Sequence, residues 1–108
     1  MSKTLVGAIR WDAWVGERNP LALTFAKNLS SFEYHHRLPF FAEMIDEVNA
    51  KVDGVRQDIY DKEIEYARNA GIDYFAVCWY PDGSGLEYQR KLYFTSQKRF
   101  DVKWCIIH

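Results

Sequence analysis

The clearest pattern of apolar and polar positions lies in the middle of the chain. Tyr60, Ile64 and Ala67 recur at i, i+4 and i+7, which predicts a helix with one apolar face. Gly71 follows where many helices end in a left-handed residue. The run 74–80 is continuously apolar and aromatic, the pattern of a parallel strand that is covered on both faces.

The rest of the chain is predicted to repeat this alternation of helix and strand. Residues 5–11 form an apolar run that predicts a first strand, and residues 101–108 predict a third. Ser84 and Glu87 have the spacing of a capping box, which predicts a helix from there to about Lys98. Strands that alternate with helices indicate an α/β fold, and right-handed crossovers make the neighbouring strands parallel. We expect one α/β domain over residues 1–108.

The segment between the first two predicted strands is harder to interpret. Asn19 and Pro20 are a favourable cap and first residue for a short helix over residues 21–29. Residues 30–39 are predicted to form a loop. The apolar stretch that begins at residues 39–41 could be strand or helix, because its period does not separate the two.

Composition excludes several classes of protein. The sequence is 48% hydrophobic and 17% aromatic, which argues against disorder. A net charge of -1 gives no electrostatic reason to expect nucleic acid or an acidic membrane surface as partner. We find no secretory signal pattern and no apolar run of membrane-spanning length. Cys78 and Cys105 lie in apolar runs and are predicted to be buried thiols, so we expect a reducing, cytoplasmic location.

The candidate chemistry lies where the predicted strands end. In parallel α/β folds, binding sites form at the carboxyl ends of the strands. Arg10, Asp12 and Trp14 follow the first predicted strand, and Trp79 and Tyr80 end the second. Aromatic planes against sugar C–H faces, with hydrogen bonds from charged groups, would suit a glycan. The alternative interpretation is that the tryptophans simply cover the end of the sheet or barrel.

Other motifs are weaker. His35 and His36 are adjacent, so on an extended chain their rings point apart and are a poor metal chelate. The glycine-rich loop 83–85 lacks the spacing and the lysine of a phosphate-binding loop. The acidic residues of the central helix are interpreted as a solvated face. We expect no cofactor and no metal site, and no catalytic nucleophile with a base at recognisable spacing.

Five segments of the chain together resemble a known family, in the same order. They are residues 7–14, 34–42, 61–67, 70–76 and 79–80. The pattern resembles the amino-terminal part of glycoside hydrolase family 71/99-like proteins, which include the WbsX-like proteins of bacterial glycan loci. The resemblance implies a (β/α)8 barrel that acts on polysaccharide or glycan, with the five strand-end residues lining sugar subsites. In the family 99 hydrolases, carboxylates on later strands do the acid/base work with retention at an α-mannosidic linkage, and no residue here matches them.

The length leaves three alternatives open, because a full barrel needs about 250 residues and this chain has 108. The chain could be a barrel fragment whose partner is the remainder of the barrel, a set of copies that cover one another as a homo-oligomer, or a smaller α/β fold. Our first functional hypothesis is a carbohydrate-active, glycoside-hydrolase-like protein, with enzymatic activity left open. The second is a non-enzymatic oligomeric α/β binding or assembly module. A small nucleotide-binding domain is a third.

Overall fold

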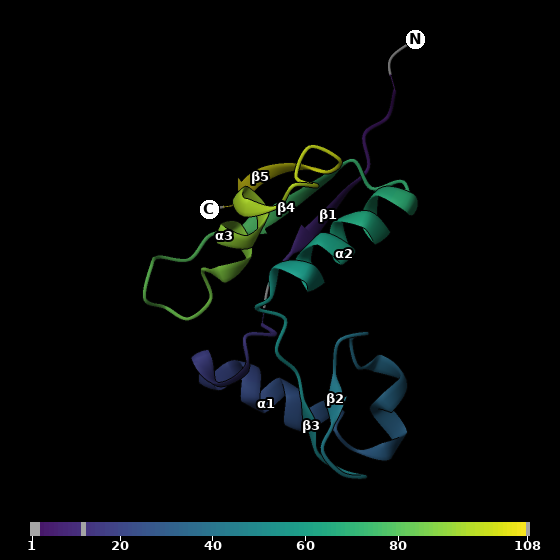
Figure 1. Ribbon diagram of the computed structural model, residues 1–108, viewed down its shortest axis with the longest axis vertical. Helices are drawn as coiled ribbons and strands as arrows, with labels where there is room; N and C mark the ends of the chain where they lie inside the picture. The colour runs from purple at the N-terminus through teal and green to yellow at the C-terminus, as the bar shows by residue number, and fades with distance from the viewer. Residues whose placement is uncertain (1–2, 12, 108) are drawn as a thin grey trace.

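A computed structural model describes residues 3–11 and 13–107. Three strands form one sheet, and a separate two-stranded hairpin lies in a long insertion (Figure 1). The elements in chain order are β1 (Gly7–Arg10), η1 (Gly16–Arg18), α1 (Pro20–Leu29), η2 (Phe32–Arg37), β2 (Glu43–Met44), β3 (Ala50–Lys51), α2 (Gln57–Asn69), β4 (Tyr74–Cys78), α3 (Tyr88–Thr95) and β5 (Lys103–Ile107).

The main sheet has the strand order β1-β4-β5, and both pairs of neighbours are parallel. β4 is the central strand, with Phe75 opposite Ala8 on one side and Trp104 on the other. The three strands are those that the sequence predicts, each shorter by two or more residues. The α/β class and the parallel pairing are therefore confirmed.

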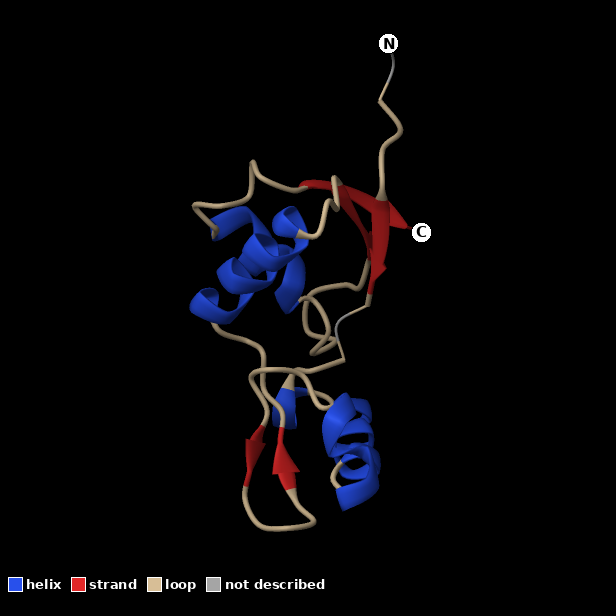
Figure 2. Ribbon diagram, turned by 90° about the vertical axis from the view of Figure 1, so that its right-hand side faces the viewer, coloured by secondary structure: helices blue, strands red, loops and turns tan. Residues whose placement is uncertain are grey.

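Helices α2 and α3 pack on the same face of this sheet (Figure 2). On that face, Phe75 and Val77 of β4 are buried in a core that includes Ile64 of α2 and Tyr93 of α3. Crossovers between parallel strands are right-handed. When they join strands in sequential order across a sheet, their helices pack on the same face, as α2 and α3 do here. The prediction that β4 is covered on both faces is wrong for the described residues.

The second face of the sheet carries both cysteines. Cys105 lies opposite Ala76 in the parallel register, and its side chain is exposed, while Cys78 is half-buried. Both thiols are free. The prediction of two buried thiols is therefore wrong for Cys105, because no helix of the described chain covers this face.

Two predicted helix ends are confirmed by their hydrogen bonds, whereas the helix predicted from Ser84 to about Lys98 is shorter, since α3 spans Tyr88–Thr95. Gly71 has a φ of 86°, and the N–H of Ile72 donates to the carbonyl of Ala67 at 2.9 Å, which closes the end of α2. At the start of α1, the side-chain oxygen of Asn19 accepts the N–H of Leu21 at 2.9 Å.

Residues 13–56, which we call the insertion, form a small unit beside the sheet and its two helices, the strand unit (Figure 1). Within the insertion, the predicted loop 30–39 contains η2, and the stretch from residue 39 turns into the antiparallel pair β2-β3. Val15 and Ala22 pack there against Leu86 of the strand unit in a second core. The insertion is thus attached to the loop before α3.

That loop makes a close backbone contact with the insertion. Glu87 accepts the N–H of Gly83, and Ser84 accepts the N–H of Leu86, so the predicted capping box closes a turn before α3 begins. Gly85 has a φ of 84°, and a Cβ there would lie 2.2 Å from the carbonyl oxygen of Arg18. Only glycine allows this approach.

We predict that Gly85→Ala destabilises the protein more than Gly83→Ala does. Both glycines have positive φ, which costs about 1 kcal/mol when alanine is introduced. A Cβ at Gly83 meets no atom within 4 Å, whereas one at Gly85 meets the Arg18 carbonyl and should cost a further ~1–3 kcal/mol. Urea unfolding measures both, and equal losses would contradict the close contact.

Candidate functional site

Arg10, at the carboxyl end of β1, lies beneath the sheet among side chains of both helices. Its Nη2 lies 2.5 Å from Oε2 of Glu63 on α2, and its Nε donates to Oε1 of Gln89 on α3 at 3.0 Å. The guanidinium carbon lies 4.6 Å from the ring centre of Tyr60, a cation–π distance. Arg10 therefore joins β1 to α2 and α3, and only 19% of its side chain is exposed.

An open hollow of about 240 Å³ lies at this end of β1. We call it the strand-end hollow; its lining includes Arg10, Trp11, Trp14, Phe40, Phe41 and Glu63. The exposed 19% of the Glu63 side chain, like that of Arg10, contributes to this lining. The hollow therefore combines an aromatic wall with one charged pair.

A second hollow of about 340 Å³ adjoins the first along α1. We call it the α1 hollow, and it shares Trp11 and Trp14 with the strand-end hollow. The Trp11 ring meets Phe25 of α1 edge to face, with centroids 5.6 Å apart. The two indoles thus line both hollows, of which the α1 hollow is mostly apolar and the strand-end hollow is mixed in polarity.

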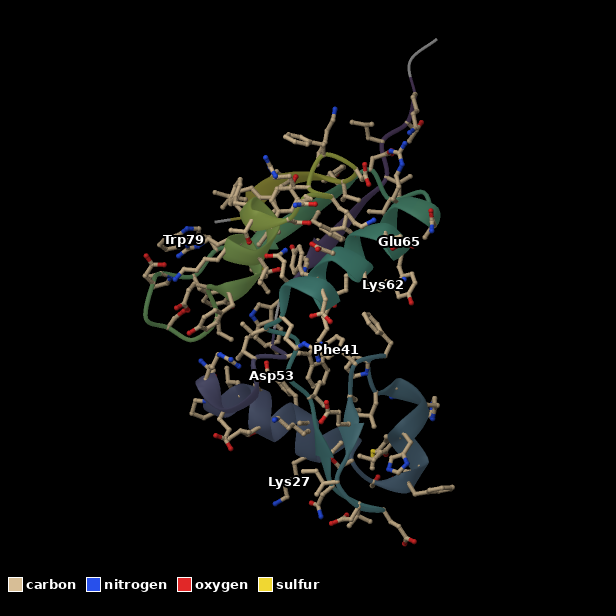
Figure 3. The ribbon with its side chains drawn as sticks, viewed as in Figure 1. Lys27, Phe41, Asp53, Lys62, Glu65 and Trp79 are labelled. Carbon is tan, nitrogen blue, oxygen red and sulfur yellow. The ribbon has the colours of Figure 1, made fainter. Side chains whose placement is uncertain are left out.

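Phe40 and Phe41 extend the aromatic lining of the strand-end hollow from the insertion to α2. The two rings meet edge to face at 5.2 Å, and Phe40 meets Tyr66 of α2 at 5.3 Å. Gly54 lies against Phe41, since a Cβ at Gly54 would be 2.9 Å from the ring. Figure 3 shows Phe41 at the junction between the insertion and α2.

The residues predicted from the strand ends do not all gather here. Trp79 stands exposed on the α3 side of the molecule, with the guanidinium of Arg90 5.9 Å from its ring centre (Figure 3). Tyr80 packs against the second core. Neither is among the described residues that line the two hollows. Asp12 lies outside the described residues, so its predicted role stays a prediction.

Glu63 is the site residue that sequence reasoning missed. The prediction of a solvated acidic face on the central helix is wrong for Glu63, whose side chain is 19% exposed and pairs with Arg10. Glu63 lies three positions after Tyr60 and next to Ile64, both of which are buried against the sheet. Its position on the apolar side of α2 was the available signal, because i and i+3 share a helix face.

A second ion pair ties the insertion together. Nη1 of Arg18 lies 2.8 Å from Oδ2 of Asp53, and the other Asp53 oxygen accepts the N–H of Val55 at 3.0 Å. Burial acts to raise the pKa of Asp53, but the hydrogen bonds from Arg18 and Val55 outweigh it and hold the pKa below its ordinary value. Asp53 is therefore ionised when it pairs with Arg18.

Within residues 3–11 and 13–107, no cluster of three or more metal-ligating side chains is found. His35 uses its Nε2 on the carbonyl of Ser30 at 2.7 Å. In the glycine-rich loop, the N–H of Gly83 is already bonded to the carboxylate of Glu87, which opposes phosphate binding there. The helices of these same ranges are too short or too polar to cross a membrane.

Comparison with known proteins finds no matching family, no matching curated protein and no matching solved structure. The chemistry of the site is therefore argued from its geometry.

We predict that Asp53→Asn flattens the loss of stability at acid pH. With its pKa lowered in the folded state, Asp53 stabilises the fold fully above its ordinary pKa near 3.8, and this contribution is lost as the pH falls through the lower folded value. The variant should be about 0.5–1 kcal/mol less stable at pH 7 and should lose less on acidification. Urea unfolding from pH 7 to pH 3 measures the effect.

The matched control is Glu33→Gln, which changes an exposed carboxylate of η2. The described part of the chain shows no ion pair for Glu33, so this variant should follow the parent curve. An Asp53→Asn curve that runs parallel to the parent would contradict the assigned role of the pair.

Proposed function

We propose that this protein binds a carbohydrate at the strand-end and α1 hollows. The observation that carries the proposal is the pair of indoles, Trp11 and Trp14, shared by two adjoining hollows beside the Arg10–Glu63 pair. The face of an aromatic ring has a partial negative charge, which attracts the slightly positive C–H groups of a sugar ring. Small-molecule sites are usually lined by apolar side chains with a small number of polar groups among them.

The size of the two hollows favours a short saccharide over a single large ligand. Volumes of about 240 and 340 Å³ lie at or below the lower end of the range for drug-sized ligands. Each hollow suits about one ring, and the shared indoles would lie between consecutive rings. The substrate class that fits best is therefore a di- or oligosaccharide.

The polar pair supplies directional contacts for the ring in the strand-end hollow. Arg10 is a donor and the Glu63 carboxylate an acceptor, so together they match a sugar hydroxyl that both accepts and donates. Charge-assisted hydrogen bonds of this kind are stronger than neutral ones. Glycosidases use two carboxylates at a set separation, and Glu63 is the one carboxylate among the described lining residues of the hollows. The proposal is therefore one of binding, with hydrolysis left out.

The proposal extends to a barrel-derived fold. Its support is the sequential strand order β1-β4-β5, with all strands parallel and both α2 and α3 on one face. The first three βα units of a (β/α)8 barrel would have this arrangement, with the hollows at the carboxyl end of the strands where barrel sites form.

We predict that Trp14→Ala weakens saccharide binding at least about tenfold, because it removes the wall common to both hollows. A panel of neutral mono- and oligosaccharides is titrated while the intrinsic tryptophan fluorescence is followed, and calorimetry then gives Kd for the best binder. Trp79→Ala is the matched control, since Trp79 is exposed on the α3 side.

Two results would overturn the proposal. The first is a panel in which no saccharide changes the fluorescence or releases heat. The second is an unchanged Kd in Trp14→Ala. If saccharide binding is weakened in Trp79→Ala alone, the site lies at the end of β4 instead. A Glu63→Gln variant tests the polar contribution; because it also removes the ion pair with Arg10, its Kd is compared together with its urea unfolding curve.

A further inference from the structure

The loop between α3 and β5 presents an aromatic ring and basic side chains to solvent. Phe100 is 82% exposed, and the guanidinium of Arg99 lies 4.4 Å from its ring centre. Residues 98–103 hold three basic side chains and one acidic one, and Lys98 also lies 3.8 Å from Oε2 of Glu65 on α2. We call Lys98, Arg99 and Phe100 the basic knob. A single exposed ring is common on protein surfaces, so the case for an interface depends on how the basic knob matches a second surface of the molecule.

The β2-β3 turn and η2 form the opposite kind of surface. They enclose an open hollow of about 630 Å³ lined by Phe32, His35, Met44, Asp46, Glu47 and Val48, which we call the acidic hollow. Phe32 is 83% exposed there. Residues 43–48 contain three acidic side chains and no basic one. Its walls are apolar and its rim is negative.

The rim charge is fixed by the turn itself. Asp46 accepts the side-chain amide of Asn49 at 2.7 Å and the N–H of Val48 at 2.9 Å. The hydrogen bond from Asn49, followed by that from Val48, holds the pKa of Asp46 below its ordinary value. Asp46 therefore stays negative through the neutral range, while Met44 gives the hollow an adaptable wall.

These two surfaces lie at opposite ends of the molecule. The longest extent is 51 Å, against 30 and 24 Å for the others. In Figure 1 the α3–β5 loop lies towards one end of this axis and the β2-β3 turn at the other. One chain therefore cannot bring its own basic knob to its own acidic hollow, although the two match in charge and both carry exposed apolar groups.

We propose that the protein self-associates head to tail, with the basic knob of one copy docked in the acidic hollow of the next. The Phe100 ring enters the apolar hollow, and Arg99 and Lys98 face the carboxylates of Asp46 and Glu47. The contact is heterologous, because each copy uses a different surface on its two neighbours. Such contacts build closed rings or open filaments according to the rotation between copies.

The first experiment measures the mass of the intact chain by sedimentation velocity over a range of concentrations and salt. We expect a concentration-dependent assembly that weakens as NaCl rises, since exposed charges are screened. Phe100→Ser should weaken the association at least about tenfold without unfolding the chain, because this ring is mostly outside the core. Ile9→Ser is the matched control: Ile9 is 77% exposed and belongs to neither the basic knob nor the acidic hollow, although it lines the strand-end hollow.

The second experiment tests the heterologous geometry. Phe100→Ser keeps the acidic hollow and loses the knob, while Val48→Lys keeps the knob and places a positive charge in the hollow. At a concentration where the parent chain assembles, each variant alone should be monomeric. Their equimolar mixture should form a capped 1:1 dimer of two 12.8 kDa chains, because one functional knob meets one functional hollow.

Three outcomes would overturn the proposal. One is a monomer at every concentration up to about 1 mM, the range of the weakest specific complexes. Another is an assembly that survives Phe100→Ser but is lost in Ile9→Ser, which would place the interface at β1. The last is a mixture of the two variants that gives no dimer. Since the knob and acidic hollow share no residue with the sugar site, saccharide binding can fail or persist independently.

Discussion

The ion pair between Arg10 and Glu63 is the contact on which the arrangement of this molecule depends. Among the described residues, β1 is an edge strand that pairs with β4 alone, so backbone pairing holds it on one side. Arg10 adds a link to α2 through Glu63 and another to α3 through Gln89. Breaking a buried pair by removing one partner is costly because the other charge stays desolvated. The helices and the edge strand are therefore fixed to one another at the end where the site lies.

The insertion follows β1 shortly after Arg10 and leads directly into α2, which carries Glu63. The position of its aromatic residues therefore depends on where β1 and α2 are held. The second core around Val15 and Leu86 and the backbone contact at Gly85 fix its other side. Binding residues on loops that a rigid scaffold positions are a common arrangement in proteins. Here the scaffold is a three-stranded sheet, and the proposed binding surface lies where it meets the insertion.

Local signals predicted the strand unit well. The period of Tyr60, Ile64 and Ala67 and the stop at Gly71 are readable because helix faces and caps depend on neighbouring residues. The site was harder to predict, because it depends on the path of the insertion. Trp14 and Trp79 both follow strands, yet the insertion brings phenylalanines to Trp14 and leaves Trp79 with Arg90.

The side on which a strand residue points also limited the prediction. Arg10 and Ile9 are neighbours on β1, and alternation sends them to opposite faces. Sequence alone could not say which face the helices cover, because both faces of β4 are apolar. Once α2 and α3 cover one face, Arg10 is enclosed and Ile9 is exposed. The same choice exposed Cys105, which its apolar neighbours had suggested would be buried.

The insertion also has a consequence for the order in which the sheet is built. Gly7 pairs with Tyr74, 67 residues further along, whereas Tyr74 pairs with Lys103 after only 29. Closing the longer loop costs more chain entropy, and contacts distant in sequence slow folding. The pairing of β4 with β5 around α3 should therefore precede the docking of β1. The ion pair between Arg10 and Glu63 would then form last, so the proposed binding surface would be completed only in the final step of folding.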